Sequence, residues 1–522
     1  MKRLSSIILT TLLLSITIPS LYSGICSSCD CKSVSQTFFA IRPQYQSGSP
    51  EKESLFYERM DLKEDGHYGT VQAVLFGGKS NHRDELGSYF APFCKKCLYV
   101  SSVEEDGIDI NAQHFNIALA GDAIFKSKIS FCPQVTTFGI GLTYKQNLSQ
   151  LWSDDPDRNF DVWAEITSPI TRVETNMCMT EKILTPEERT PLEIEGLNQQ
   201  FYTSMTDAFK QRAWCYGKID SCCCDMVKWR LADIEVKVGL QRRLDACGNH
   251  FYGGYVGLLI PTGNRPCATY VFKPIVGHRK HFGLTKGGYA KFQMWENEAG
   301  DRKIYASWLS HILYLFDGEE KRSLDLKYKP WSRYMEVYNS KEQAQMAADF
   351  ETEGNFEAAA HLSTPGINVF TQCLKVKPRI SGTINTAFIF SGQNWEFEAG
   401  YNFFARAAEC VSLECKWPCG IALKDSVGEG RTNSVRTISQ NNINCAKEID
   451  EYESNIINAC DLDLESAAHP GMISNTIYGV AGYTWDGKDY PMLFALGGSY
   501  EYGDANFVLC RWTGWLKYSL SF

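Results

Sequence analysis

The sequence predicts an all-β fold: a transmembrane antiparallel up-and-down β-barrel of about 14 strands, within a range of roughly 12 to 16, with helical loop insertions. Three observations lead to this prediction. The last fifteen residues alternate between apolar and polar side chains, and the same alternation recurs along the chain. After residue 23, no apolar run is long enough for a membrane helix. The mean hydropathy of −0.26 is compatible with a membrane barrel, because every second residue of its strands faces away from lipid.

The final segment, residues 508–522, has one apolar face and one mostly polar face. The even positions are Val508, Cys510, Trp512, Gly514, Leu516, Tyr518, Leu520 and Phe522, and Trp515 is the main exception on the other face. Such a strand suits a wall between hydrocarbon and water, because successive side chains point to opposite faces. The alternative is an edge strand of a soluble sheet.

With its aromatic carboxyl-terminal residue, this segment resembles the last strand of the outer-membrane β-barrel proteins of Gram-negative bacteria. The resemblance implies that Tyr518, Leu520 and Phe522 form a signal read by the barrel-assembly machinery. It also implies that the chain lies in the cell outer membrane, in contact with its lipid.

The amino terminus has the layout of a secretory signal peptide. Lys2 and Arg3 precede an apolar run, residues 7–18, and Pro19 interrupts it. We expect the signal to span residues 1–23, with cleavage ahead of Gly24. The formal charge of −9 then becomes −11, since two cations are removed (−9 minus 2). An acidic chain without clusters of Lys and Arg is a poor partner for nucleic acid.

Alternating segments recur through the rest of the chain. The clearest are residues 136–144, 232–241, 380–390 and 394–403, and noisier ones are 160–166, 304–316 and 492–502. Their length is near the 9–11 residues of a tilted membrane strand and exceeds the ~5–6 of an ordinary soluble strand. Three pairs read as hairpins: residues 379–391 with 394–406, 478–485 with 492–502, and 250–260 with 269–276. An antiparallel meander of this kind predicts an up-and-down barrel.

The remaining segments are less regular. Residues 185–212, 340–350 and 444–466 show helical spacing or tendency and are expected as helical insertions. We assign residues 111–522 to the barrel. Residues 24–110 form an N-terminal region that supplies either the first strands or a plug or cap, and its stretches 36–45 and 68–76 look like strands.

If the apolar faces meet lipid, the opposite faces line an interior. The candidate pore-lining residues are Asp233, Glu235, Lys237, Glu396, Glu398, Arg511 and Lys517. Opposed acidic and basic side chains across a water-filled lumen select small hydrophilic solutes by size and charge. The alternative is that these charges pair with one another in a filled barrel.

All 20 cysteines follow the signal, and export to an oxidising compartment favours disulfides. The candidates in expected loops are Cys26, Cys29, Cys31, Cys94, Cys97, Cys222, Cys223, Cys224, Cys410, Cys415 and Cys419. The spacing Cys94-x2-Cys97 also occurs in zinc knuckles, but the compartment argues against zinc, and we expect no metal. Cysteine richness in a barrel resembles the major outer-membrane porins of chlamydiae, which implies cross-linking that stiffens the envelope.

Signatures of catalysis are missing. Neither Gly-x-Ser-x-Gly nor His-Glu-x-x-His spacing occurs, and His278 and His281 sit in a turn-like stretch. We therefore expect neither an enzyme nor a cofactor.

The sequence predicts an outer-membrane porin-like channel for passive or facilitated diffusion of small hydrophilic solutes. The alternatives are a disulfide-cross-linked surface adhesin or envelope structural protein anchored by a barrel, and a secreted soluble β protein. A homo-oligomer such as a trimer, or disulfide-linked neighbours, stays open.

Overall fold

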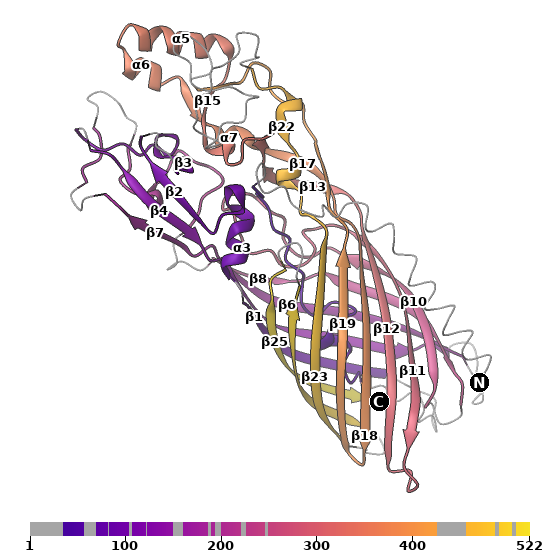
Figure 1. The fold of residues 1–522 in the computed structure, drawn as a ribbon. Helices are drawn as coiled ribbons and strands as arrows, with labels where there is room; N and C mark the ends of the chain where they lie inside the picture. Colours follow the sequence, from indigo (N-terminus) through magenta and orange to yellow (C-terminus); the bar gives the residue numbers. More distant parts are fainter. Residues whose placement is uncertain are drawn as a thin grey trace.

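The computed structural model describes residues 35–522 except 57–68, 82, 104–106, 122, 150–159, 186–188, 194–199, 221–225, 246–248, 425–455, 486–489 and 504–507. The expected signal peptide lies outside these residues. The described chain forms a β-barrel and a head region stacked on one end of it (Figure 1). We call the barrel end next to the head the head end, and the opposite end the turn end.

The barrel wall is a closed antiparallel ladder. In the part of the chain that the structure describes, twelve strands form the ring, a number inside the expected range and below the central value of about 14. In order around the barrel they are β1 (Gly69–Ser80), β5 (Gln134–Asn147), β6 (Phe160–Asn176), β9 (Ile234–Arg243), β10 (Phe251–Ile260), β11 (Gly283–Glu296), β12 (Arg302–Leu315), β18 (Arg379–Gly392), β19 (Trp395–Arg406), β23 (Met472–Trp485), β24 (Met492–Tyr502) and β25 (Arg511–Ser521).

The ring closes because the last strand returns to the first. β25 pairs with β1 from Thr70↔Ser521 to Ser80↔Arg511, and β5 links β1 to β6. One further described strand of the same sheet, β8 (Met226–Leu231), pairs with the head-end part of β6 outside the ring.

Apolar side chains cover the outside of this ring. Val256, Phe388 and Leu496 are 67%, 64% and 60% exposed, and in β25 the exposed positions alternate with buried ones as the sequence predicts. Trp515, the exception, points inward and lies over Gly497, where an added Cβ would come within 2.3 Å of the indole. A closed strand ring with an apolar outer surface leaves no backbone group unpaired in lipid. The chain is therefore an outer-membrane β-barrel protein.

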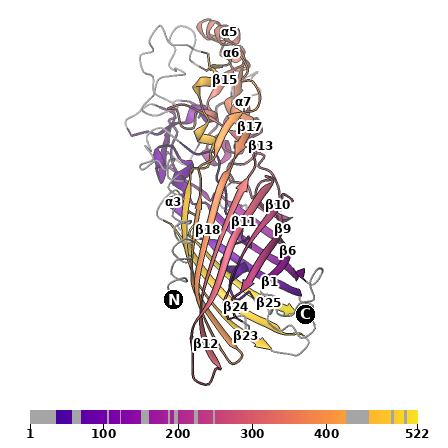
Figure 2. The same cartoon turned by 90° about the vertical axis from the view of Figure 1, so that its right-hand side faces the viewer.

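The connections give the barrel a direction. Short turns, such as residues 297–301 and 393–394, join strands at the turn end. The described parts of the long insertions between β1 and β5, β12 and β18, and β19 and β23 lie at the head end (Figure 2). The chain also ends at the turn end, where the amide of Gly69 donates to the carbonyl oxygen of Phe522 at 2.7 Å. Outer-membrane barrels have short periplasmic turns and long external loops. The head therefore faces outward from the cell. Among the described residues, no helix is long and apolar enough to cross a bilayer.

The head is built from these insertions and has the largest apolar core of the described chain, which includes Phe115, Phe209, Trp331 and Tyr334. Its elements are α3 (Arg83–Phe90), η2 (Pro92–Cys94), β2 (Cys97–Ser101), β3 (Ile110–Asn111), η3 (Ala112–Phe115), β4 (Lys126–Phe131), β7 (Met179–Ile183), α4 (Met205–Ala208), β13 (Gly318–Ser323), β14 (Asp325–Leu326), η5 (Ser332–Tyr334), β15 (Glu336–Tyr338), α5 (Lys341–Thr352), α6 (Phe356–Ala360), β16 (Ser363–Pro365), α7 (Gly366–Phe370), β17 (Thr371–Lys377), β20 (Cys410–Leu413), β21 (Ala422–Leu423), η6 (Ala459–Asp461), β22 (Leu462–Asp463) and η7 (Glu465–Ala467).

Two expected strands are wrong. Residues 36–45 form no strand and run from the head into the barrel. Residues 269–276 form a loop, so β10 pairs instead with β11, and the 22 residues 261–282 lie between the two strands. Gly-rich β11 was missed because its sequence, GLTKGGYAKFQMWE, does not alternate. The helix expected at 340–350 is confirmed as α5, whose cap Ser340 accepts from the Gln343 amide. Within 185–212, the described helix is only α4, and most of 444–466 lies outside the described residues or forms single turns.

The outward face generates a stability prediction. Val256 lies near the middle of β10 and is paired with Val238 of β9. The substitution Val256→Arg should destabilise the folded barrel by about 2–4 kcal/mol, because the guanidinium would face the bilayer. Unfolding by urea in lipid vesicles measures this. As a control, Met346→Arg, on the exposed face of head helix α5, should change stability by less than about 0.5 kcal/mol. Equal effects of the two substitutions would contradict a lipid-facing Val256.

Candidate functional site

The lumen of the barrel holds a separate piece of chain, residues 38–56, which we call the inner segment. It enters from the head, where Phe39 packs in the head core, and includes one helical turn, α2 (Pro50–Glu53). Its hydrogen-bond partners lie on β1, β5, β6, β9, β19, β24 and β25. The inner segment therefore spans the lumen from wall to wall.

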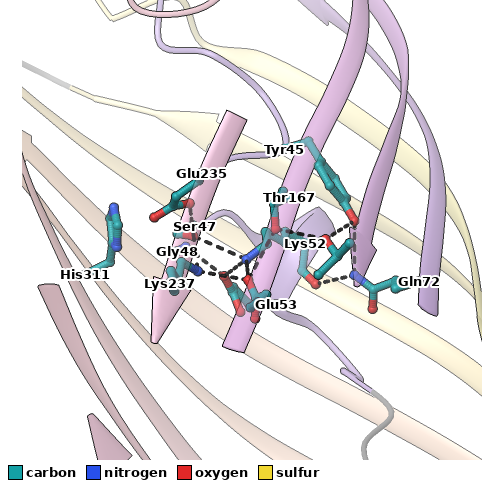
Figure 3. A network of polar contacts seen from close by, with 12 residues as sticks. Tyr45, Ser47, Gly48, Lys52, Glu53, Gln72, Thr167, Glu235, Lys237 and His311 are labelled. Atoms are coloured by element: carbon teal, nitrogen blue, oxygen red, sulfur yellow. Dashed lines mark hydrogen bonds and ion pairs between the residues drawn. The ribbon is translucent and has the colours of Figure 1, made fainter. Parts of the chain in front are cut away.

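At mid-barrel, the inner segment is held by ion pairs (Figure 3). Lys52 Nζ of α2 lies 2.7 Å from Glu165 Oε1 on β6 and 3.3 Å from Glu53 Oε1. Lys237 Nζ on β9 approaches the same oxygen of Glu165 at 3.0 Å, so one carboxylate lies between two ammonium groups. Ser47 Oγ donates to Glu235 on β9. Except for the half-buried Glu53, these side chains are buried, so no bulk water separates the inner segment from the wall at this level.

A second set of contacts lies closer to the head. Arg42 Nη1 lies 3.2 Å from Glu501 Oε1 on β24, and Arg511 Nη2 on β25 lies 3.1 Å from the other oxygen of that carboxylate. Arg42 also donates to Asn402 Oδ1 at 3.2 Å. Here the wall supplies both an anion and a cation, and the inner segment supplies the second cation.

The lower end of the inner segment is bound through its backbone. Lys517 Nζ on β25 donates to the carbonyl oxygens of Lys52, at 3.0 Å, and of Ser54. The amide of Leu55 donates to Glu398 Oε2 at 2.6 Å, and Tyr478 donates to the other oxygen of Glu398 at 2.8 Å. Polar groups of the wall thus satisfy backbone groups that the single turn of α2 leaves open.

A glycine sets the bend that precedes α2. Gly48 has φ +84°, and a Cβ at this position would lie 2.9 Å from Thr383 Cβ and 3.3 Å from His311 Cβ on the facing wall. Both the left-handed conformation and the close approach require glycine.

An ionic junction cluster lies where the barrel meets the head. It consists of Arg279, Glu320, Arg322 and Glu409, with Arg279 Nη1 at 2.5 Å and Arg322 Nη1 at 2.7 Å from the two oxygens of Glu409. Burial alone would raise the pKa of Glu320, but Arg279 and Arg322 outweigh it and lower that pKa to about 2. The Arg322 guanidinium lies 3.7 Å from the ring centroid of Phe38, the first residue of the inner segment. The cluster therefore remains charged at neutral pH and covers the entry of the inner segment.

Between the inner segment and the turn end lies a cavity of ≈ 280 Å³. Its upper boundary is formed by Glu53, Leu55 and Phe56 of the inner segment. The wall contributes aromatic and charged side chains, among them Lys145, Trp163, Arg243, Phe251, Tyr255, Tyr289, Lys291, Tyr305, Glu396 and Glu398. Two cations lie over rings: Lys145 Nζ is 4.2 Å from the Trp163 ring centroid, and Lys291 Nζ is 4.4 Å from that of Tyr305.

The structure places six of the seven predicted pore-lining residues on the inner side of the wall. Glu235, Lys237, Glu398, Arg511 and Lys517 are buried there, and Glu396 lines the cavity. The seventh, Asp233, lies in the break between β8 and β9, and its carboxylate accepts from the amide and Nδ1 of His278. Through His278, Asp233 therefore holds loop 261–282 in place at the head end. The three residues of the predicted assembly signal lie on the outer face of the last strand. Tyr518 and Phe522 are 44% and 43% exposed, and Leu520 is half-buried.

Several residues of the site escaped the sequence prediction. Glu165 lies on the polar face of the alternating segment 160–166, so its inward direction could have been found from that pattern. The position of the inner segment in the lumen has no such signal. The wall carboxylates that hold its cations, Glu501 for Arg42 and Glu165 for Lys52, lie more than 100 residues away in the chain.

The predicted disulfide candidates are only partly described. Cys26, Cys29, Cys31, Cys222, Cys223 and Cys224 lie outside the described residues. Cys94 lies in η2, and no disulfide joins Cys97, Cys410, Cys415 or Cys419 to another cysteine in the described ranges. Within those ranges, no group of three or more His, Cys, Asp or Glu side chains could hold a metal ion.

Comparisons with known proteins give only distant matches. No family model matches the chain, and no curated protein matches it. An outer-membrane channel from Pseudomonas putida F1 aligns with a TM-score of 0.36 at 10% identity, covering 87% of this chain and 96% of that one. The transport unit of the autotransporter AIDA-I from Escherichia coli aligns at 0.29 and 7% identity, covering 90% and 93%. A Pseudomonas aeruginosa FadL homologue aligns at 0.26 and 8% identity, covering 87% and 89%.

The bend of the inner segment generates a prediction. Gly48→Val should displace the inner segment, because the side chain would collide with Thr383 and His311, and overpacking of this kind costs about 1–3 kcal/mol. Hydrogen exchange of the amides of residues 38–56 should accelerate roughly tenfold or more, with the wall strands unchanged. The matched control is Gly107→Val, since Gly107 has a similar φ of +86° but no atom within 4 Å of the added Cβ. Unchanged exchange in the inner segment of Gly48→Val would contradict the tight fit.

Proposed function

We propose that this chain is an outer-membrane channel for the passive or facilitated diffusion of small hydrophilic solutes, and that the inner segment closes it. One observation carries the proposal: the middle of the lumen is filled by a separate, polar piece of chain. A barrel of about eight strands can be filled by the side chains of its own wall, whereas a wider one needs loops or other segments to close it. Removing residues 38–56 would leave a lumen bordered by twelve described strands.

The contacts that hold the inner segment favour a closure that can be released. Lys52, Glu165 and Lys237 form ion pairs, and the other contacts are mostly hydrogen bonds. Water can replace each of these contacts when the groups separate in a hydrated lumen, so the net free energy of such pairs is small. A barrel used only as an anchor has no need of a polar interior. An apolar filling of the same volume is often as stable or more stable.

The cavity on the turn-end side supports the proposal that the transported solute is small and carries polar groups. Its lining includes the cations Lys145 and Lys291, each over an aromatic ring, and the carboxylates Glu396 and Glu398. Side chains of opposite charge across a narrow lumen impose a transverse field that orients dipolar solutes. The proposal is of a transport function without catalysis.

A surface protein anchored by its barrel is the second candidate. The size of the head favours it, because the head holds the largest apolar core and is built from insertions at one end of the barrel. Cysteine cross-linking of the head to neighbouring molecules in the envelope would fit this function. The experiments on current below separate the two candidates.

Opening the lumen tests the channel directly. A mature chain that lacks residues 24–56, incorporated in planar bilayers, should pass ion current, and the full-length chain should pass at least tenfold less. Because the deletion also removes Phe39 from the head core, Lys52→Glu serves as a second variant, which places a third carboxylate beside Glu53 and Glu165. Lys210→Glu in the head is its matched control. Absence of current from both variants, with heat-modifiable migration in detergent proving a folded barrel, would favour the anchor instead.

Charge on the cavity wall should set ion selectivity. In the chain that lacks residues 24–56, Lys291→Glu should shift the reversal potential under a salt gradient toward cation selectivity, since a cation that lines the cavity becomes an anion. Lys128→Glu, on head strand β4, is the matched control and should leave the reversal potential unchanged. Equal potentials for the two variants would show that the current does not pass the cavity.

A further inference from the structure

The two strands at the junction of barrel and head bring a pair of cysteines face to face. Strand β4 of the head ends at Phe131, and β5 of the wall begins at Gln134, so only Cys132 and Pro133 separate them. On the neighbouring strand, β6 of the wall ends at Asn176 and β7 of the head begins at Met179. Each of these two connections between wall and head is therefore two residues long, and one residue of each is a cysteine.

The pairing register is continuous across this junction. In the head, Phe131 pairs with Met179, and in the wall, Gln134 pairs with Asn176. The residue numbers of both pairs sum to 310 (131 plus 179 and 134 plus 176), so no residue is inserted between them. Cys132 and Cys178 therefore lie opposite one another in this register, and the Cys132 amide donates to the carbonyl oxygens of both Met177 and Cys178, each at 3.3 Å.

We propose that Cys132 and Cys178 form an intrachain disulfide that fastens the head to the barrel wall. Opposed residues of an antiparallel pair have their Cα atoms about 4.5–5.5 Å apart, within the roughly 4.4–6.8 Å that a disulfide requires. In a regular ladder, the side chains of opposed residues lie on the same face. The neighbours Phe131, Met177 and Met179 are buried in the head core, whereas both cysteines are half-buried.

The backbone at the junction explains what the bond would do. Pro133 has no amide hydrogen to donate to the ladder, and Cys178 has φ +45°, which is costly for a residue with a Cβ. The amide of Cys178 donates to the Asn176 side chain at 2.6 Å instead of to the opposite strand. The hydrogen-bonded ladder is thus interrupted at this point, and a covalent bond would keep wall and head in register across the interruption.

The chemistry is thiol–disulfide exchange on the exported chain. One thiolate attacks a disulfide-bonded donor and forms a mixed disulfide, and the second thiolate then displaces the donor sulfur. The two cysteines lose two electrons and two protons and form one S–S bond, while the donor disulfide gains two electrons and two protons and becomes a dithiol. The head end faces the outside of the cell, where such bonds persist.

Counting thiols on the full chain tests the pairing. The protein is isolated from outer membranes with a maleimide present from lysis, unfolded without reductant, and analysed by mass spectrometry of its peptides. We expect a linked peptide that joins residues 132 and 178. Cys132→Ser and Cys178→Ser should each gain one maleimide-reactive thiol relative to the parent protein, and the double variant should gain none. A linkage of either cysteine to any other residue, or maleimide on both in the parent protein, would overturn the proposal.

A matched pair controls for the register. Ser130 and Thr180 are opposed two residues further into the head, and their hydroxyl oxygens lie 2.7 Å apart. In the Cys132→Ser/Cys178→Ser background, Ser130→Cys together with Thr180→Cys should form a linked peptide during the same export. If this control pair links while the native pair is alkylated, the register is right and the native disulfide is disproved. The readout does not depend on ion current, so the result for the disulfide is independent of whether the chain is a channel.

Discussion

The pairing of backbone groups in lipid is the constraint on which the rest of this structure depends. A strand that crosses the bilayer must give every N–H and C=O a partner, because no water is present to replace one. β25 meets this requirement by returning to β1 over eleven residue pairs, from Thr70↔Ser521 to Ser80↔Arg511. Once the ring is closed, alternate side chains have only two directions, and the apolar ones must face outward. The polar ones then face a lumen, and the inner segment fills that lumen with groups that bind them.

The two surfaces of the wall consequently obey different rules. On the lipid side, shape and charge pairing matter little, and the exposed positions are simply large and apolar. On the lumen side, each buried charge needs an oppositely charged or hydrogen-bonding neighbour, since an unpaired buried charge costs several kcal/mol. Glu165 meets this need with Lys52 and Lys237, and Glu501 meets it with Arg42 and Arg511. The wall and the inner segment therefore determine each other residue by residue.

The sequence predicts the wall better than the lumen for this reason. Alternation in 136–144 and 394–403 follows from the two-sidedness of a strand and identifies β5 and β19 and their inward faces. β11 has little alternation, and one cause is Gly287, where an added Cβ would come within 2.4 Å of the Tyr255 ring. The inner segment is irregular, so its position depends on contacts made after the ring closes. Charged positions such as Glu398 were found as inward-facing, but their partner, the Leu55 amide, could not be inferred from spacing.

The attachments of the inner segment limit how it can move. At the head end, Phe39 belongs to the head core, and Ser35 donates to Asp325 Oδ2 at 2.7 Å, a carboxylate that Arg333 also binds. Beyond its lower end the chain continues to β1, which starts at the turn end beside Phe522. A segment fixed at the head and continuous with the wall cannot leave the lumen as a free plug. It must either rearrange between these two attachments or move together with the head. The stiffness of the junction between head and wall therefore bears directly on how far the lumen can open.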